Sequence, residues 1–372
     1  MAYNILGINP FHNGSACILS DGKIVYFLEE ERLTKYKHDA NPFKVILDTL
    51  NKFKINEVVI AGINREDAKL PYTNEDPFYA LIRKYYPSIG IKCTIPFKSY
   101  SNYHHNCHNF LSFLNSGFKK ALGVVIDSGG SYSKNEEYTF ETDTIYNCDF
   151  SLDNVIEPLQ TTYCKIKHNT PISLNVAGVY SSITFSLGFN TSEEGKVMGL
   201  SSYGDPNSYL PPFFKNQKYV TNGIAKDIFI DNCRRTIPYP LLASRKTNWH
   251  KNPNIDCSLE KDIAYKLQSE VQQTVGDVIE EQINNTNHTN IVCSGGYFLN
   301  CVSNYYLAKR FPHLNFYFEP VSHDGGTAIG AAYWRWKELN PNFQPKKLNS
   351  IYFGPQYTKE QLLEGIKKYV SN

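Results

Sequence analysis

Two histidines four residues apart are the first residues of this sequence that could do chemistry. His104 and His108 lie in the segment SNYHHNCH, and on a helix a spacing of four places two side chains on one face, one turn apart. Two imidazoles so placed can bind one metal ion, although such a pair is also common as a purely structural feature. We expect Ser101 to cap this helix, Gly117 to end it and His105 to face solvent. The pair becomes a metal site only if carboxylates reach it.

Two aspartates stand at positions that suit such a site. Asp127 ends an apolar strand and precedes a Gly-Gly turn, and Asp324 lies in SHDGG between a strand and the start of a helix. Either carboxylate alone could equally cap a turn or a helix. With the two histidines they form a nitrogen and oxygen donor set that suits a divalent transition metal, and iron(II), manganese and zinc are the candidates.

Three glycine-bearing turns at strand ends could bring backbone N–H groups close to phosphates. They are GINPFHNG at 7–14, DSGGS at 127–131 and SGG at 294–296. None matches a P-loop or a dinucleotide fingerprint, and each by itself is more often a plain turn. Their arrangement, two early loops in repeated strand patterns and one late turn before a helix, is typical of actin-like and sugar-kinase-like ATPases.

Two charged segments are further candidates. EEERLTKYKH follows a predicted strand and places Arg32 near Lys37, which suits a phosphate or an oxyanion as well as it suits a solvated surface. EEGKVMGLSSYG combines Glu194 and Lys196 with glycines, a pattern that fits a mobile loop near a site or an ordinary surface turn.

The elements that position these residues alternate between strands and helices, which indicates an α/β fold. A strand meander with a hairpin turn at Asp21-Gly22 opens the chain, and strands followed by helices return later, so two related lobes are predicted. The predicted strands span 3–8, 14–19, 23–29, 57–62, 123–127, 138–144, 290–294 and 315–319. The predicted helices span 41–53, 258–283, 300–310 and 326–339, and Ser258 is the expected N-cap of the longest.

Composition restricts the class of protein. The 372 residues carry 38 Lys and Arg against 36 Asp and Glu, a net charge of +2, so no basic surface for a long nucleic acid is indicated. No apolar run is long enough to span a membrane, and we expect no secretory leader. Nine scattered cysteines without a CxxC pair favour reduced thiols. We therefore expect a soluble, cytoplasmic protein.

Together these motifs resemble the NodU/CmcH-type O-carbamoyltransferases, in the N-terminal domain that is related to the tRNA threonylcarbamoyladenosine transferase subunit TsaD. The matching strings follow the family order over residues 5–333, and EEERxTxxKH and EGKVMGL are specific to the family. The strings are GINPFHNGSACILSDGKIV, FLEEERLTKYKH, HHNCH, VVIDSGG, EEGKVMGLSSYG, CSGGYFLNCVSN and SHDGGTAIGAA.

The resemblance implies a duplicated ribonuclease H-like (actin-like, ASKHA) fold that holds a metal and a nucleotide between two lobes. Residues 1–119 would form the first lobe and 120–345 the second, with an insertion or lid at 205–256. Residues 346–372 would begin the connection to a YrdC-like domain that is not part of this sequence. This chain alone is then not expected to make an adenylate.

The resemblance also implies roles for individual residues. The metal, iron in the family, would be bound by His104, His108, Asp127 and Asp324. The nucleotide would be contacted by Ser128, Gly129, Gly130, Glu194, Lys196, Gly295, Gly296 and Asn300. His12 would face the acceptor hydroxyl as a base, with Arg32 and Lys37 assisting by their charge. Asn13 stands where relatives carry an acid.

The implied reaction moves a carbamoyl group from carbamoyl-adenylate to a hydroxyl of a small molecule, such as a natural product, a sugar or a hydroxymethylated nucleotide. The adenylate would be made from carbamoyl phosphate and ATP by a YrdC-like domain or partner. Two alternatives stay open: threonylcarbamoyl transfer to tRNA, which the near-neutral charge disfavours, and a non-catalytic nucleotide-binding module. A homodimer is one option for the assembly.

Overall fold

A computed structural model of the chain describes most of its residues. The described residues are 2–63, 80–82, 84–85, 95–132, 139–167, 170–171, 175–190, 192–210, 212–215, 218–219, 229–231, 234–236, 257–344, 346–354 and 357–370. Most of the predicted insertion at 205–256 lies outside them.

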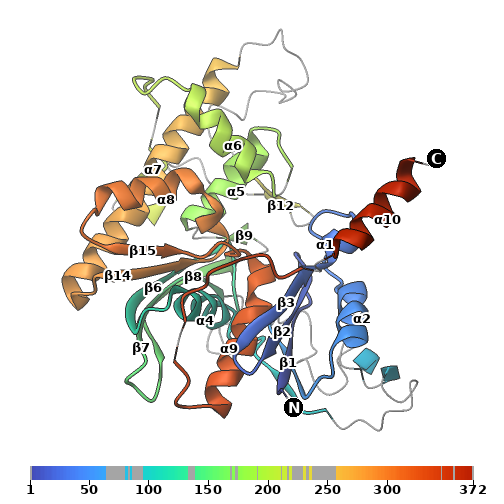
Figure 1. Cartoon of the computed structure of the whole chain (residues 1–372). Helices are drawn as coiled ribbons and strands as arrows, with labels where there is room; N and C mark the ends of the chain where they lie inside the picture. The colour runs from blue at the N-terminus through green and yellow to red at the C-terminus, as the bar shows by residue number, and fades with distance from the viewer. Residues whose placement is uncertain are drawn as a thin grey trace.

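The first sheet has five strands in the order β3-β2-β1-β4-β5 (Figure 1). β1, β2 and β3 form the predicted antiparallel meander, and β4 and β5 join β1 in parallel. Asp21 and Gly22 make the predicted turn, with φ angles of 46° and 77° that suit a tight hairpin. The strands span Asn4–Asn9, Ser15–Ser20, Lys23–Glu29, Glu57–Ile60 and Phe97–Ser99.

The second sheet has six strands in the order β15-β14-β6-β7-β8-β9. From the other edge, β8-β7-β6-β14-β15 repeats the order of the first sheet, with the same antiparallel and parallel pairings. This repeat confirms the predicted duplicated ribonuclease H-like fold. The strands span Lys120–Ile126, Thr139–Asp149, Ile156–Lys167, Thr170–Pro171, Asn290–Ser294 and Asn315–Phe318. Short hairpins lie at Phe214–Lys215 with Lys218–Tyr219 (β10, β11) and at Phe229–Asp231 with Arg234–Thr236 (β12, β13).

The helices include several that the sequence patterns did not indicate. EGKVMGL forms helix α6 and a 3₁₀ turn follows it, so neither the mobile loop nor the ordinary surface turn that the sequence suggested is present there. Ser258 is the first residue of α7 and Cys257 occupies its N-cap position, which corrects the predicted cap. The helices are α1 Glu30–Thr34, α2 Phe43–Lys52, α4 His104–Ser116, α5 Val176–Ser186, α6 Glu194–Leu200, α7 Ser258–Thr286, α8 Cys301–Arg310, α9 Thr327–Leu339 and α10 Lys359–Val370.

Two helices join the halves of the molecule. α4 follows the first sheet in the chain but packs on β6 and β14 of the second, while α9 follows the second sheet and packs on β1, β2 and β4 of the first. The two helices also pack on each other (Figure 1). Their approach needs Gly330, where a Cβ atom would lie 1.9 Å from the Cys107 carbonyl oxygen. Both helices start beside the strand ends that carry the site residues.

Apolar side chains fill the space on both sides of each sheet. The buried stripe of α7 runs through Ile263, Leu267, Val271, Val275 and Ile279, at the predicted steps of three and four. Each such side chain stabilises the fold by about 1.5–3 kcal/mol when it is fully buried. The seven described cysteines are free thiols. Among the described residues, no helix has the length and apolar character that crossing a membrane requires.

Candidate active site

His104 and His108 lie in the first turns of α4, and both imidazoles are fully buried. Their Nε2 atoms are 3.2 Å apart, and the rings meet edge to face. Gly117 ends the helix with a φ of 74°, as predicted. The expected cap was wrong, because Tyr103 rather than Ser101 occupies the N-cap position.

Asp127 and Asp324 reach the two imidazoles from two segments far apart in the chain. Asp127 follows β6, and its Oδ2 lies 3.3 Å from His104 Nε2 and 3.7 Å from His108 Nε2. Asp324 opens the 3₁₀ turn before α9, and its Oδ1 lies 3.6 and 3.5 Å from the same two nitrogens. The four ligand atoms all lie within 4.8 Å of one another, and all four residues are buried. We call these four residues the His/Asp cluster.

The spacing of these atoms fits a bound metal. A metal ion about 2.1 Å from each of two ligands at a tetrahedral angle keeps those ligands about 3.4 Å apart. The nitrogen–oxygen distances of 3.3–3.7 Å agree with this value. Two imidazoles and two carboxylates are also the mixed donors that iron(II), manganese or zinc accept.

The electrostatics of the cluster reflect two carboxylates packed against buried imidazoles. Burial alone would lower the pKa of His104, but Asp324 and Asp127 raise it to about 10. Burial and Asp324 push the pKa of Asp127 up, yet hydrogen bonds with His104 and His108 bring it below its usual range. The pKa of Asp324 is held well below its usual range against burial, first by His12 and then by His104. A divalent cation would therefore compete with a proton at His104.

His12 lies beside the cluster and reaches solvent. Its Nε2 is 3.1 Å from Asp324 Oδ2, and its side chain is 58% exposed. The turn that carries it is closed by Asn9, whose side-chain N–H group donates to the carbonyl oxygens of His12 and Asn13. Asn13 adopts a φ of 56°, which asparagine tolerates better than most residues.

Glu29 and His323 form a second pair nearby that the sequence patterns did not indicate. His323 Nε2 is 3.0 Å from Glu29 Oε1, and the Gly325 N–H donates to His323 Nδ1. The neutral ring therefore carries its proton on Nε2 and donates it to Glu29. Arg32 lies 3.8 Å from Glu29 and 3.3 Å from Glu31, and its side chain is 66% exposed.

Two of the predicted phosphate loops meet at the end of β6. The Ser128 N–H donates to its neighbour's carboxylate, Asp127 Oδ1, at 2.7 Å. Gly295 has a φ of 96°, and a Cβ atom there would lie 2.3 Å from the Ile126 carbonyl oxygen, so only glycine fits. A Cβ atom on Gly296 would lie 3.1 Å from Asp127 Oδ1. The SGG turn therefore packs closely against the end of β6 and the start of the DSGGS loop that follows it.

His105 does not face solvent as expected. It is fully buried, because β7 and the DSGGS loop cover this face of α4. Its Nδ1 is 2.8 Å from Thr144 Oγ1, and its Nε2 has no hydrogen-bond partner among the described residues. A Cβ atom on Gly130 would lie 2.8 Å from that Nε2. Burial lowers the pKa of His105 to about 4, so the ring is neutral at pH 7.

Comparison with known proteins identifies the family of this chain. Residues 74–333, more than half of the sequence, match the family described as Carbamoyltransferase N-terminus. The chain belongs to this family. The expected resemblance to the NodU/CmcH-type carbamoyltransferases is thereby confirmed.

Relatives of this carbamoyltransferase-family chain include two nodulation proteins. NolNO of Sinorhizobium fredii is 24% identical over 95% of this chain and 50% of its own length. NolO of Bradyrhizobium diazoefficiens is 24% identical over 70% of this chain and 43% of its own length. An uncharacterized protein of Methanocaldococcus jannaschii is 27% identical over 99% of this chain and 64% of its own length. The chain thus spans about half to two thirds of the curated relatives that it matches along nearly its whole length.

A solved structure agrees with the fold. HypF of T. kodakarensis superposes on 91% of this chain and 48% of its own chain, with a TM-score of 0.52 and 10% sequence identity. At this identity the likeness supports the fold of the carbamoyltransferase-family chain and nothing more.

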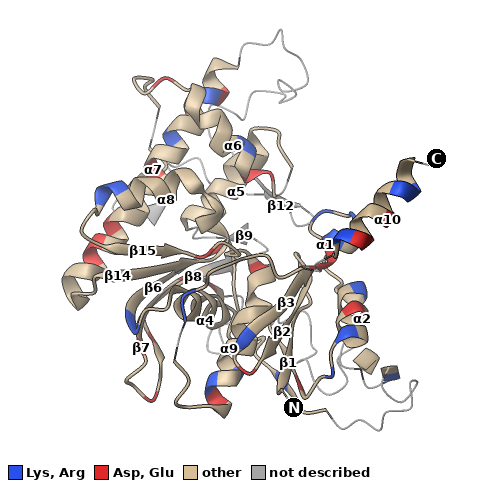
Figure 2. Cartoon of the chain, viewed as in Figure 1, with Lys and Arg blue, Asp and Glu red and all other residues tan. Residues whose placement is uncertain are grey.

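The remaining predicted site residues of this family member are not part of the His/Asp cluster. Glu194 begins α6 and accepts a hydrogen bond from a serine of α5, and Lys196 pairs with the neighbouring Glu193 at 2.6 Å. Asn300 is the N-cap of α8. Lys37 is exposed after α1, where basic and acidic residues lie side by side (Figure 2). The nucleotide and catalytic roles of these residues stay predictions.

Proposed function

We propose that this member of the carbamoyltransferase family transfers a carbamoyl group from carbamoyl-adenylate to a hydroxyl of a small-molecule acceptor. The observation that carries the proposal is the position of an exposed histidine, His12, 3.1 Å from a carboxylate of the buried His/Asp cluster. The family match over 74–333 supports the choice of group transferred.

The His/Asp cluster would hold a divalent cation, iron(II) by the family resemblance and manganese or zinc by donor chemistry. Such a cation supplies Lewis-acid stabilisation of phosphate oxygens and offsets the negative charge of a nucleotide. The donor spacing and the burial of the four residues support this assignment.

His12 is suited to remove the proton of the acceptor hydroxyl. Its Nε2 lies 3.1 Å from Asp324 Oδ2, so a proton on Nε2 would face this carboxylate and Nδ1 would be the nitrogen that takes the proton. The same carboxylate then stabilises the imidazolium that forms. The half-exposed position of the ring leaves room for an acceptor to approach from solvent.

The acyl transfer itself needs orientation and charge stabilisation. The acceptor oxygen attacks the carbamoyl carbon, the bond from that carbon to the phosphate oxygen breaks, and AMP leaves with the electron pair.

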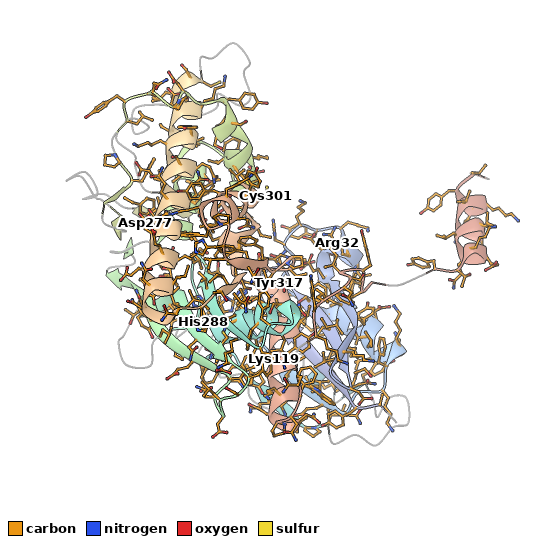
Figure 3. All side chains as sticks on the ribbon, turned by 60° about the vertical axis from the view of Figure 1, so that its left-hand side comes forward. Arg32, Lys119, Asp277, His288, Cys301 and Tyr317 are labelled. Atoms are coloured by element: carbon orange, nitrogen blue, oxygen red, sulfur yellow. The ribbon has the colours of Figure 1, made fainter. Side chains whose placement is uncertain are left out.

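The two glycine-bearing loops would bind the phosphate through their backbone N–H groups. The residues concerned are Ser128, Gly129 and Gly130 of DSGGS, and Gly295 and Gly296 of SGG. Arg32 lies on the first-sheet half, and Cys301, next to Asn300, lies on the second-sheet half (Figure 3). We assign charge assistance to Arg32 and Lys37, and contacts with the nucleoside to Glu194, Lys196 and Asn300.

The adenylate is assigned to a separate activity. We propose that a YrdC-like domain or partner makes it from carbamoyl phosphate and ATP, in the cytoplasm, where free thiols stay reduced. The division into lobes at 1–119 and 120–345, with 346–372 as a connection, stays a prediction. AMP release from carbamoyl phosphate and ATP by the 372-residue chain alone would contradict this part of the proposal.

The test is a mass-spectrometric screen of alcohols for the gain of one carbamoyl group, with a YrdC-like partner, carbamoyl phosphate, ATP and iron(II) present. We expect one class of acceptor to be modified by the wild type. His104→Ala should abolish the product and His12→Ala should slow its formation about 10²- to 10³-fold. His313→Ala, which removes an exposed histidine that is not part of the cluster, should leave the product unchanged. Full transfer by both site variants would refute the proposal.

A further inference from the structure

The helix that carries both histidines of the His/Asp cluster begins without a cap from its own segment. Among the described residues, the N-cap Tyr103 makes no capping hydrogen bond with its side chain. A helix leaves its first N–H groups without partners inside the helix. His104 and His105, the first residues of α4, are fully buried, so bulk water does not reach these groups.

The missing cap comes from the second-sheet half. The His104 N–H donates to Ser131 Oγ at 3.0 Å, and the His105 N–H donates to Glu141 Oε1 at 3.2 Å. Ser131 closes the DSGGS loop, and Glu141 lies on β7. A hydroxyl and a carboxylate are the groups that cap helices best, and a negative charge is favoured at a helix N-terminus.

The same two residues also hold the DSGGS loop. The Ser131 N–H donates to Glu141 Oε1 at 2.9 Å, so this oxygen is shared between the loop and the helix. The Gly130 N–H donates to the Glu141 carbonyl at 2.7 Å, and the Glu141 N–H donates to the Ser131 carbonyl at 3.0 Å. The Ser131 hydroxyl in turn donates to the Ser101 carbonyl, just before the helix.

The start of α4 and the DSGGS loop are in close contact. A Cβ atom on Gly130 would lie 2.5 Å from Glu141 Cγ and 2.8 Å from His105 Nε2. The His105 ring is itself held by Thr144 of β7. A shift of the loop therefore moves the start of α4, and with it the imidazole of His104.

We propose that Ser131 and Glu141 are positioning residues that cap α4 from the other half of the molecule and so couple the His/Asp cluster to the DSGGS loop. The inference rests on the proposed function, in which the cluster binds a metal and the loop binds the phosphates of a nucleotide. A metal that fixes the start of α4 also orders the loop that is tied to it, so we expect metal binding to tighten nucleotide binding. Because coupling between two sites is reciprocal, nucleotide binding tightens metal binding by the same factor.

The test uses Mn²⁺ and ADP as probes on the full 372-residue chain. Mn²⁺ binding is followed by the electron paramagnetic resonance of free Mn²⁺, and ADP binding by calorimetry with and without Mn²⁺. We expect Glu141→Ala and Ser131→Ala to weaken Mn²⁺ binding about tenfold and to reduce, by about the same factor, the tightening of ADP binding by Mn²⁺. Glu141→Gln and Ser131→Thr keep an acceptor oxygen and should stay within about threefold of the wild type.

Glu30 offers a matched control on another helix. Its carboxylate oxygens accept from the N–H groups of Lys44 and Val45 at the start of α2, which carries no residue of the His/Asp cluster. Glu30→Ala should lower the melting temperature about as much as Glu141→Ala and leave the Kd for Mn²⁺ unchanged. A merely structural role for Glu141 would instead make the two variants alike in both measurements.

The binding measurements distinguish a failure of the proposed function from a failure of the coupling through Ser131 and Glu141. A wild type that binds neither Mn²⁺ nor ADP refutes the proposed function and this inference with it. A wild type that binds both, with Glu141→Ala and Ser131→Ala binding them equally well, overturns the inference alone. If Glu141→Ala does not fold, Ser131→Ala against Ser131→Thr provides the same comparison.

Discussion

The turn after β1 and the loop after β6 occupy equivalent places in the duplicated fold, and they carry opposite kinds of group. The first presents His12, which is 58% exposed and held by one carboxylate contact. The second places Asp127 in a buried cluster and ties Ser131 to a helix start. Equivalent loops thus present an exposed histidine in one half, and a buried carboxylate with a helix-capping serine in the other.

This contrast fits the roles that we propose for the two loops. A base must meet an acceptor that arrives from solvent, so it benefits from exposure. Metal ligands must hold a fixed geometry with few competing waters, so they benefit from burial and from partners that lock their orientation. The helices α4 and α9 cross between the halves and bring the two kinds of group together.

Loss of a carboxylate from the buried His/Asp cluster should have the largest effect on metal binding and transfer. Asp127→Ala takes one ligand from the His/Asp cluster and leaves His104 and His108 with a single carboxylate. We expect bound metal to fall below a tenth of an equivalent per chain and carbamoyl transfer to fall about a thousandfold or more. Metal analysis of the purified variant, beside a transfer assay, checks this. Retention of a full equivalent of metal would contradict the assignment of the cluster.

Loss of the exposed His12 side chain should slow the transfer reaction and leave metal binding unchanged. His12→Ala is expected to lower the rate of transfer about 10²- to 10³-fold, since general-base catalysis contributes about this much. Metal content should stay at the wild-type level, because His12 contacts the cluster only from its solvent side. Single-turnover transfer from supplied carbamoyl-adenylate separates this step from adenylate formation. If His12→Ala lost as much metal as Asp127→Ala, both loops would contribute to metal binding and the proposed difference between them would be wrong.

The affinity of the buried His/Asp cluster for metal should also depend on pH. In the metal-free protein the pKa of His104 is raised to about 10, so at neutral pH a cation must displace its proton. Apparent metal affinity should therefore rise about tenfold per pH unit, or about a hundredfold from pH 6.5 to 8.5. The same raised pKa stabilises the metal-free fold most below the unfolded value near 6.5, and this stabilisation is lost as pH rises through 10. Metal titrations at several pH values test the slope, and a flat profile would contradict it.

The smallest effect should come from Asn13, next to His12. Asn13→Asp introduces the acid that the family resemblance implies at this position, and both residues tolerate the φ of 56° found there. We expect the free energy of unfolding to change by less than about 0.5 kcal/mol and the transfer rate by less than about threefold. A larger gain in rate would mean that the acid takes part in the reaction, and would shift the comparison between the loops.

Local sequence patterns predicted much of the frame of the site. Short apolar runs and the Asp21-Gly22 turn indicated the first meander, and steps of three and four indicated α7. The spacing of His104 and His108 indicated that they share a helix face. These features depend on residues within a few positions of one another, and the periods of strands and helices are visible at that range.

Other parts of the site could not be predicted in this way. Ser101 stands where a local cap would be expected, yet the cap of α4 comes from Ser131 and Glu141 on the other half. His105 is polar and adjacent to the pair, yet β7 and the DSGGS loop bury it. No pattern marked Glu141, since an acid on a strand of alternating polarity reads as an exposed residue.

Residues close together in the chain carry the strand and helix periods, the pairing of two imidazoles on one helix face, and the motifs that point to the family. The approach of Asp127 and Asp324 to those imidazoles, and the capping of their helix by a distant loop, are features of the folded molecule. They depend on how β6, β14 and the crossing helices α4 and α9 lie in space, because hydrogen bonds and packing across the halves form only there. Contacts between residues so far apart in the chain leave no period in the sequence.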